Sequence, residues 1–340
     1  MAESIVGLDL DSLEAYFRRE VPGFAGLASA ELIHGGRSNL TYLLSTGDEQ
    51  WVLRRPPLGG LTPSAHDMGR EYRVVDALQN TGVPVARTVS LCEDIEVIGA
   101  PFAVVAYVGG IVLRTESDLH DLAQDDLNAC AHALMATLAQ LHDVPPAQVG
   151  LEGFGKPDGY LRRQVRRWID QWHRVSTREL PDLDRLYARL AESVPVESGS
   201  AIVHGDFRVD NAILHGDRLA EIRAVLDWEM AALGDPLADL GLSLVYRDPA
   251  FAPVLGGDAA STSARMPDRD SLAESYARTS GRDLGDLSFY LALGYFKIAV
   301  IAEGIHARYL DGKTVGGGFD TVGPAVPELV AAGLRAYHQA

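Results

Sequence analysis

The most specific chemical pattern in the sequence is His-Gly-Asp-Phe-Arg-Val-Asp-Asn at 204–211, followed by Asp227 within Ala-Val-Leu-Asp-Trp-Glu. It combines a carboxylate (Asp206), an amide (Asn211) and a second carboxylate (Asp227) near short apolar segments. Phosphoryl transfer from a magnesium nucleotide needs such a set, because one carboxylate orients and deprotonates the acceptor and two oxygen ligands hold Mg2+. We therefore predict Asp206 as the catalytic base and Asn211 and Asp227 as metal ligands. The alternative is an ordinary hairpin with polar ends.

Two residues near this motif are predicted to support it. His204 precedes the catalytic carboxylate and is interpreted as a structural brace of the loop. Asp239 lies in Gly-Asp-Pro-Leu-Ala-Asp-Leu-Gly at 234–241, where Asp235 caps a helix and Pro236 occupies its first position. One turn into that helix, Asp239 is placed to accept hydrogen bonds from backbone N–H groups of the catalytic loop.

A candidate phosphate clamp comes from an earlier strand. Residues 51–55 read Trp-Val-Leu-Arg-Arg, so Arg54 shares one face with Val52. We predict that Arg54 contacts the nucleotide phosphates and that Glu71, in the following helix, holds it in place. A surface arginine and a solvated glutamate are the alternative interpretation.

The loop Gly-Gly-Arg-Ser-Asn-Leu-Thr at 35–41 could bring backbone N–H groups close to phosphate, since glycine carries no Cβ. Its predicted nucleotide contacts are Gly36, Ser38 and Asn39, although a Gly-Gly pair in a hairpin is often only a turn. Ala106 and Val108, at the end of a predicted strand over 101–108, are further predicted nucleotide contacts.

Periodicity predicts an α+β chain with a small β-rich N-terminal lobe and a large, mainly helical C-terminal lobe. Strands are expected around 32–55, 85–91 and 101–108, with a short helix over 8–20 and another helix after Ser64. Gly109-Gly110 is the expected hinge, which divides the chain into 1–108 and 109–340. The predicted C-terminal helices cover 122–142, 158–175, 182–193, 236–245, 270–279, 287–309 and 325–337.

Bulk composition limits the partners. The 340 residues are 47% hydrophobic and 23% charged, with a formal net charge of −17. This charge disfavours nucleic acid and anionic membrane surfaces as partners. Two cysteines, Cys92 and Cys130, favour a reducing compartment without a disulfide framework, so a cytoplasmic location is expected.

Taken together, these segments resemble the aminoglycoside phosphotransferase-like family, which shares the protein-kinase-like fold. VLRRPP, VHGDFRVDN, VLDWE and GDPLADLG most resemble the branch fused to, or encoded beside, acyl-CoA dehydrogenases. The resemblance implies transfer of the γ-phosphoryl group of ATP to a small-molecule hydroxyl, with Mg2+ as cofactor. It also carries over the roles given above for Asp206, Asn211, Asp227, Arg54 and Glu71. Arg54 replaces the usual lysine, so ATP and another nucleotide both remain open as donors.

The acceptor site is predicted from cations. Arg162 and Arg166 share one face of the helix Arg-Arg-Gln-Val-Arg-Arg-Trp at 162–168, and Lys297 lies on a later helix. Cations suit an anionic acceptor such as a hydroxyacyl-CoA better than an aminoglycoside polycation. The alternatives are an amphipathic surface helix, an aminoglycoside or amino-alcohol acceptor, and a catalytically silent nucleotide-binding module.

Overall fold

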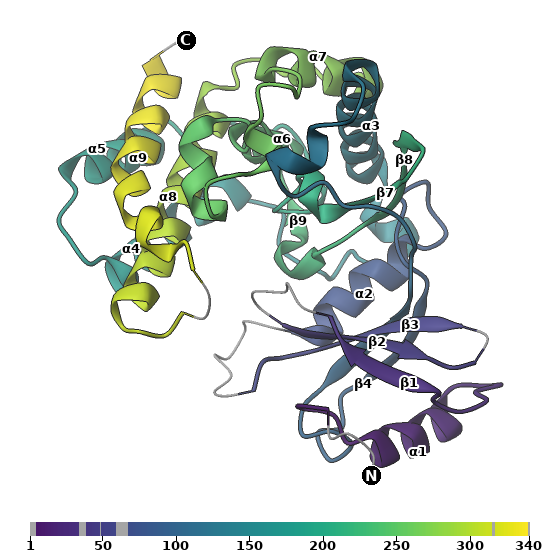
Figure 1. The fold of residues 1–340 in the computed structure, drawn as a ribbon. Helices are drawn as coiled ribbons and strands as arrows, with labels where there is room; N and C mark the ends of the chain where they lie inside the picture. Colours follow the sequence, from purple (N-terminus) through teal and green to yellow (C-terminus); the bar gives the residue numbers. More distant parts are fainter. Residues whose placement is uncertain (1–4, 34–38, 48, 59–66, 315–316, 339–340) are drawn as a thin grey trace. The chain divides into compact units, whose positions relative to one another are not determined.

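The computed structural model describes residues 5–33, 39–47, 49–58, 67–314 and 317–338 (Figure 1). The chain forms two compact units. The first contains Met1–Gly109 and Arg223–Glu229, and the second contains Gly110–Ile222 and Met230–Ala340. The predicted division after residue 108 therefore differs by one residue at the hinge, and by the segment 223–229. That segment belongs with the first unit because Val225 N donates to Pro84 O at 2.8 Å and Asp227 accepts from Arg54.

The first unit is built on one antiparallel sheet with the strand order β1-β2-β3-β5-β4. Its strands are β1 (Ser29–Leu32), β2 (Leu40–Ser45), β3 (Gln50–Arg55), β4 (Thr88–Cys92) and β5 (Phe102–Ala106). Among its described residues, this unit has the helices α1 (Leu10–Glu20) and α2 (Met68–Leu78). Helix α2 packs against β4 and β5.

Strand β3 separates an apolar face from a polar one. Trp51 and Leu53 are buried in the core that contains Phe17 of α1 and Phe102 of β5. Side chains alternate along a strand, so Arg54 points away from this core. The predicted alternation is therefore present, and it delivers one cation to the face of the sheet that α2 covers.

Helices dominate the second unit, as the sequence predicts (Figure 1). They are α3 (Gln124–Asp143), α4 (Tyr160–Val175), α5 (Pro181–Glu192), α6 (Pro236–Val245), α7 (Arg269–Ser280), α8 (Ser288–Leu310) and α9 (Val322–His338). Short strands flank the motif at 204–211: β6 (Ala201–Val203) pairs antiparallel with β9 (Ala232–Gly234), and β7 (Ala212–His215) pairs with β8 (Arg218–Val225). A 3-10 turn, η3 (Val209–Asn211), lies between β6 and β7.

Helix α8 is the structural centre of this unit and packs against α4, α6 and α9. Among the residues that the structure describes, it is the one helix long and apolar enough to cross a membrane. Its most apolar window has a mean hydropathy of 1.4, and 72% of that window is buried inside the protein. Burial among neighbouring helices accounts for this composition, because the core helix of a globular protein is apolar on most of its faces.

Candidate functional site

In the first unit, a cation on β3 pairs with two carboxylates. Arg54 Nη1 donates to Glu71 Oε1 on α2, and Arg54 Nη2 donates to Asp227 Oδ1 at 3.2 Å. The side chains of Arg54 and Glu71 are only 22% and 10% exposed. Burial raises the pKa of Glu71 despite the opposing charge of Arg54. The predicted contact between Glu71 and Arg54 is present, and Asp227 is an additional partner that the sequence did not reveal.

Asp227 has an unusual backbone conformation. Its φ of 65° makes it the one non-glycine residue with positive φ in the part of the chain that the structure describes. The flanking residues hold it there: Val225 N donates to Pro84 O at 2.8 Å, and Trp228 Nε1 donates to Val225 O at 2.9 Å. A left-handed aspartate stabilised from both sides is typical of a functional site, where backbone strain serves to direct a side chain.

Of the other predicted nucleotide contacts, the structure describes Asn39, Ala106 and Val108. Gly36 and Ser38 lie outside the described residues. The Asn39 side chain is buried, and neither polar atom of its amide has a hydrogen-bond partner among the described residues. A buried amide without partners is uncommon, and it suits a position where a ligand supplies the hydrogen bonds. Ala106 closes β5 with its N–H bonded to Arg87 O at 2.7 Å, and Val108 follows beyond the end of that strand.

In the second unit, the loop 204–211, which the sequence predicts to be catalytic and which is called the catalytic loop below, follows β6 and is fixed by Asp239. The Asp239 carboxylate accepts N–H of His204 at 2.6 Å and N–H of Gly205 at 2.8 Å, which is the bracing contact expected from the sequence. His204 Nδ1 in turn accepts N–H of Asp206 at 3.2 Å. Gly205 has φ +81°, and a Cβ there would lie 2.7 Å from Met230 O, so the loop requires glycine at this position.

A second histidine supports Asp239 from α3. His142 Nε2 lies 3.2 Å from the buried carboxylate, and His142 Nδ1 lies 2.7 Å from the Tyr276 hydroxyl. Burial alone would raise the pKa of Asp239. The hydrogen bond from His142 and those from the loop N–H groups outweigh that effect, and the pKa is lowered. Asp239 is therefore an ionised anchor, and His142 is a supporting residue that the sequence motifs did not identify.

The Asp206 carboxylate accepts three hydrogen bonds. Asn211 Nδ2 donates to Oδ2 at 3.0 Å, Arg208 Nε donates to Oδ2 at 3.3 Å, and the Tyr246 hydroxyl donates to Oδ1. Asn211 Nδ2 also donates to the Asp206 carbonyl at 2.9 Å, so the amide oxygen of Asn211 is the atom left for a cation. The structure thus brings Asp206 and Asn211 together, as the motif predicts.

Arg208 links two carboxylates of the motif, since its Nη1 donates to Asp210 while its Nε donates to Asp206. Burial raises the pKa of Asp210, and the Arg208 charge opposes that rise. The Arg208 guanidinium lies 5.7 Å from the centroid of the Tyr246 ring. Arg208 was overlooked in the sequence although it lies within the motif. Tyr246 carries a weaker signal, since it follows Asp239 by seven residues and so lies on the same face two turns further along.

Lys297 lies beneath the catalytic loop. Its Nζ donates to Gly205 O at 2.6 Å and lies 5.6 Å from the centroid of the Trp168 ring. Burial lowers the pKa of Lys297 to about 8, although the charges of Asp206 and Asp239 oppose this. The sequence prediction that Lys297 binds an anionic acceptor group did not foresee that its amine already supports the loop.

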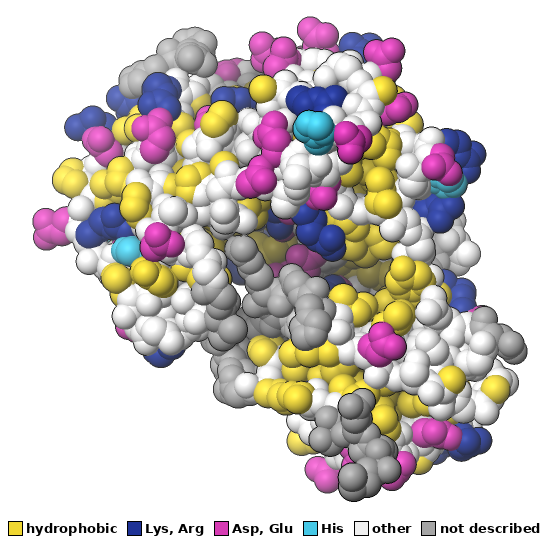
Figure 2. Space-filling view, in the orientation of Figure 1, with side chains coloured by type: hydrophobic (Ala, Val, Ile, Leu, Met, Phe, Trp, Pro, Cys, Tyr) yellow, Lys and Arg dark blue, Asp and Glu magenta, His cyan; other side chains and the backbone are white. Residues whose placement is uncertain are grey.

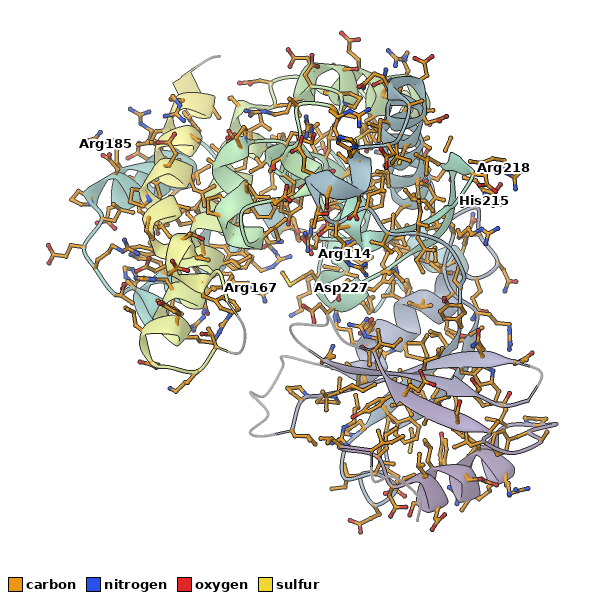
Figure 3. The ribbon with its side chains drawn as sticks, in the orientation of Figure 1. Arg114, Arg167, Arg185, His215, Arg218 and Asp227 are labelled. Carbon is orange, nitrogen blue, oxygen red and sulfur yellow. The ribbon has the colours of Figure 1, made fainter. Side chains whose placement is uncertain are left out.

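The predicted acceptor arginines lie on α4 and are exposed. The buried face of this helix contains Leu161, Val165, Trp168, Ile169 and Trp172, whereas Arg162 and Arg166 face solvent. Arg167, labelled in Figure 3, is the α4 arginine that influences the charge of Lys297. On the face of the molecule in Figure 2, acidic and basic side chains are interspersed. Helix α4 thus presents the exposed arginines Arg162, Arg163, Arg166 and Arg167 on a chain of net negative charge.

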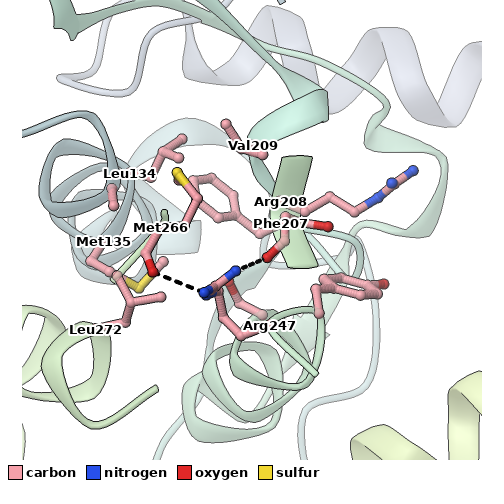
Figure 4. Close-up of a pocket in the computed structure, with 12 residues that line it drawn as sticks. Leu134, Met135, Phe207, Arg208, Val209, Arg247, Met266 and Leu272 are labelled. Carbon is pink, nitrogen blue, oxygen red and sulfur yellow. Dashed lines mark hydrogen bonds between the residues drawn. The ribbon is translucent and has the colours of Figure 1, made fainter. Parts of the chain in front are cut away.

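A cavity of about 40 Å³ lies behind the catalytic loop (Figure 4). Phe207 and Val209 line it from the loop, and Leu134, Met266 and Leu272 line it from the surrounding chain. This volume admits only a few water molecules. The cavity is therefore too small for a nucleotide or an acyl-CoA acceptor.

A two-unit kinase-like fold with these residues defines a phosphotransferase of the small-molecule kinase class. A family model described as "Phosphotransferase enzyme family" matches residues 29–279, and the chain belongs to this family. The predicted α+β, protein-kinase-like fold is confirmed by its structural relatives. A protein from Ralstonia eutropha, classed provisionally as an aminoglycoside phosphotransferase, is 35% identical with a TM-score of 0.84, covering 97% of this chain and 98% of that one. A mutant of aminoglycoside phosphotransferase APH(4)-Ia in complex with ADP and hygromycin B has a TM-score of 0.64 at 18% identity, covering 96% and 99%.

The curated relatives are longer proteins. Acyl-CoA dehydrogenase family member 10 of Mus musculus is 38% identical over 312 residues, which cover 89% of this chain and 29% of the relative. Acyl-CoA dehydrogenase family member 11 of Gallus gallus is 38% identical over 316 residues, covering 90% and 40%. The chain therefore spans less than half the length of these relatives, and the resemblance to the acyl-CoA dehydrogenase-associated branch is confirmed.

Proposed function

We propose that the protein transfers the γ-phosphoryl group of ATP to a hydroxyl of a small molecule, with a hydroxyacyl-CoA as the leading acceptor class. The observation that carries the proposal is the Asp206 carboxylate, which is fixed by Asn211, Arg208 and Tyr246 on a loop anchored to Asp239. Catalysis of phosphoryl transfer depends largely on positioning and on charge stabilisation. The hydrogen bonds to Asp206 fix the orientation of its carboxylate, as positioning of the acceptor hydroxyl requires.

The residues of the first unit fit the nucleotide. Arg54 is a cation held by Glu71 and Asp227, and Asn39 offers a buried amide without partners among the described residues. An arginine fork binds phosphate oxygens in bidentate fashion. We assign Arg54 to the phosphates of the nucleotide and Glu71 to holding its guanidinium in place. Two structural relatives contain ADP or AMP-PNP, which favours an adenine nucleotide as donor.

In the second unit, Asp206 Oδ1 receives the proton of the acceptor hydroxyl as its oxygen attacks the γ-phosphorus and ADP departs. The loop keeps the carboxylate in place during this step. When bound, Mg2+ neutralises charge on the phosphate oxygens. Asn211 Oδ1 and the Asp227 carboxylate are the proposed ligands, and both are the hard oxygen donors that this ion prefers.

The acceptor class is proposed from the relatives and from the cations of α4. The two acyl-CoA dehydrogenase family members match nearly the whole chain. Arg162 and Arg166 are exposed on α4, where they can meet the phosphates of a CoA ester. The hygromycin B complex keeps an aminoglycoside or amino-alcohol acceptor as the second candidate.

The test is ADP release by the purified protein with Mg-ATP and a panel of hydroxyacyl-CoAs, aminoglycosides, sugars and amino alcohols. Asp206→Ala should lower acceptor-dependent turnover by about 10²- to 10⁴-fold, which is the range for loss of a general base. Nucleotide affinity should be retained, because the proposed phosphate contacts are made by Arg54 and its partners in the first unit. A fully active Asp206→Ala variant would show that this carboxylate is not the base. Silence of the wild type with every acceptor would favour a nucleotide-binding module without turnover.

The acceptor class can be tested separately by calorimetric titration of a CoA ester into an Arg162→Ala/Arg166→Ala variant. The matched control is Arg185→Ala/Arg218→Ala, which removes two other exposed arginines, 62% and 66% exposed (Figure 3). Binding should weaken in the α4 variant alone. Equal affinity in both variants would remove these two arginines from the acceptor site.

A further inference from the structure

Tyr246 at the end of α6 makes a contact with the catalytic carboxylate that no motif indicates. Its hydroxyl donates to Asp206 Oδ1 across 40 positions of sequence. The ring is 4% exposed and packs on Phe251, with ring centroids 4.7 Å apart, and the Arg208 guanidinium lies over it at 5.7 Å. The tyrosine is therefore fixed on both sides of its ring, and so is the direction of its hydroxyl group.

The number of hydrogen bonds that the Asp206 carboxylate can still accept follows from counting the donors that it already has. A carboxylate has about four lone-pair sites, and Asp206 receives Asn211 and Arg208 on Oδ2 and Tyr246 on Oδ1. Counting the described residues, both sites of Oδ2 are thus occupied, while Oδ1 retains one. The Tyr246 hydroxyl selects which lone pair of Oδ1 is left, because it occupies the other one. Together with Asn211 and Arg208 it fixes the rotation of the carboxylate about χ2, which is a soft torsion.

The hydroxyl is also a constant donor. Burial and the nearby Asp206 charge raise the pKa of Tyr246 well above its ordinary value, so the phenol stays protonated. A protonated phenol beside an ionised carboxylate has one arrangement, in which it donates. Arg208 and Asn211 bond to Oδ2, and Tyr246 is the donor that occupies a lone pair of Oδ1.

We propose that Tyr246 is a positioning residue for phosphoryl transfer, which holds the Asp206 carboxylate so that one Oδ1 lone pair is left for the acceptor hydroxyl. This inference rests on the proposed role of Asp206 as the base. The acceptor proton passes to Oδ1, the acceptor oxygen bonds to phosphorus, and the bond to ADP breaks. Tyr246 neither gains nor loses a proton in that step.

The kinetic test is Tyr246→Phe, which removes one oxygen and leaves the ring. We expect kcat to fall about tenfold, in line with one hydrogen bond to a charged group, while the KM for Mg-ATP is unchanged. The matched control is Tyr295→Phe. Tyr295 is also buried, and its hydroxyl donates to the carboxylate of Asp248 and not to that of Asp206. A general loss of structure would affect both variants, whereas loss of positioning lowers kcat only in Tyr246→Phe. An unchanged kcat in Tyr246→Phe would overturn the proposal.

A double-mutant cycle in urea makes the result independent of turnover. Tyr246→Phe and Asp206→Ala, alone and together, should be non-additive by about tenfold or more in the unfolding equilibrium constant, and Tyr295→Phe should be additive with Asp206→Ala. Additivity of Tyr246→Phe with Asp206→Ala would overturn the proposal. If the cycle shows coupling but the wild type turns over no acceptor, the proposed function fails while the hold of Tyr246 on Asp206 stands.

Discussion

Replacing Asp239 with asparagine should detach the catalytic loop from α6. The wild-type carboxylate is 1% exposed and accepts N–H of His204 at 2.6 Å and N–H of Gly205 at 2.8 Å. Asparagine keeps one acceptor oxygen but turns its NH2 group toward a backbone donor. A hydrogen bond to a charged group contributes about 1.5–3 kcal/mol, so losing one and weakening the other should lower the free energy of unfolding by roughly 2–4 kcal/mol.

The pH dependence gives an independent check on the same variant. The pKa of Asp239 is lower in the folded state than in the unfolded chain. Its contribution to stability is therefore present above the unfolded value of about 4, and is lost as pH falls through the folded value. Urea unfolding of the wild type, followed by circular dichroism from neutral pH to about pH 3, should show this loss. Asp239→Asn should lack that part of the pH dependence.

Asp235→Asn is the matched control for Asp239→Asn. Asp235 begins the same helix, is also buried, and accepts N–H of Ser198 at 2.8 Å and N–H of Leu237 at 2.9 Å. Both variants should lose stability, but kcat per folded molecule should fall only in Asp239→Asn. Wild-type kcat in folded Asp239→Asn would refute the reasoning that this carboxylate positions the loop.

Three further predictions concern contacts within each unit, at Gly205, Glu71 and Lys297. Gly205→Ala should lower both stability and kcat, because the new Cβ would meet Met230 O at 2.7 Å with φ at +81°; wild-type unfolding in urea would contradict this. Glu71→Ala should raise the KM for Mg-ATP by about 10- to 100-fold, since Arg54 loses its partner on α2, and an unchanged KM in ADP-release kinetics would count against the clamp. Lys297 has a pKa of about 8, against 10.5 ordinarily, so the free energy of unfolding should rise with pH between these values. Lys297→Met should abolish that rise, and a rise that persists would assign it to another group.

Contacts between candidate site residues that lie close together in the sequence could be predicted from the sequence. The spacing of Asp206 and Asn211 places both on one short loop, and the structure joins their side chains at 3.0 Å. Strand alternation assigned Arg54 to the face opposite Leu53, and α2 follows β3 closely enough for Glu71 to be its partner. In these cases local geometry determines the neighbour.

Contacts between distant elements were not predictable in the same way. Tyr246 reaches Asp206 only because α6 packs beside the loop that follows β6. The helical period showed that Arg162 and Arg166 share a face, but not which contacts that face makes. Lys297 was recognised as a cation near the site, yet its bond to Gly205 O depends on the packing of α8. Periodicity assigns a residue to a face, and tertiary packing decides what that face contacts.

The contacts separate the candidate site into two sets with different expected phenotypes. Arg54, Glu71 and Asp227 contact one another in the first unit, although Asp227 lies beyond the catalytic loop in the sequence. Asp206 and Tyr246 belong to the second unit and contact each other there. We propose that the first set binds the nucleotide and that the second acts on the acceptor hydroxyl. Changes in the first set should therefore appear mainly in the KM for Mg-ATP and changes in the second mainly in kcat. The segment 223–229 follows the loop 204–211 in sequence, yet it places Asp227 in the first set.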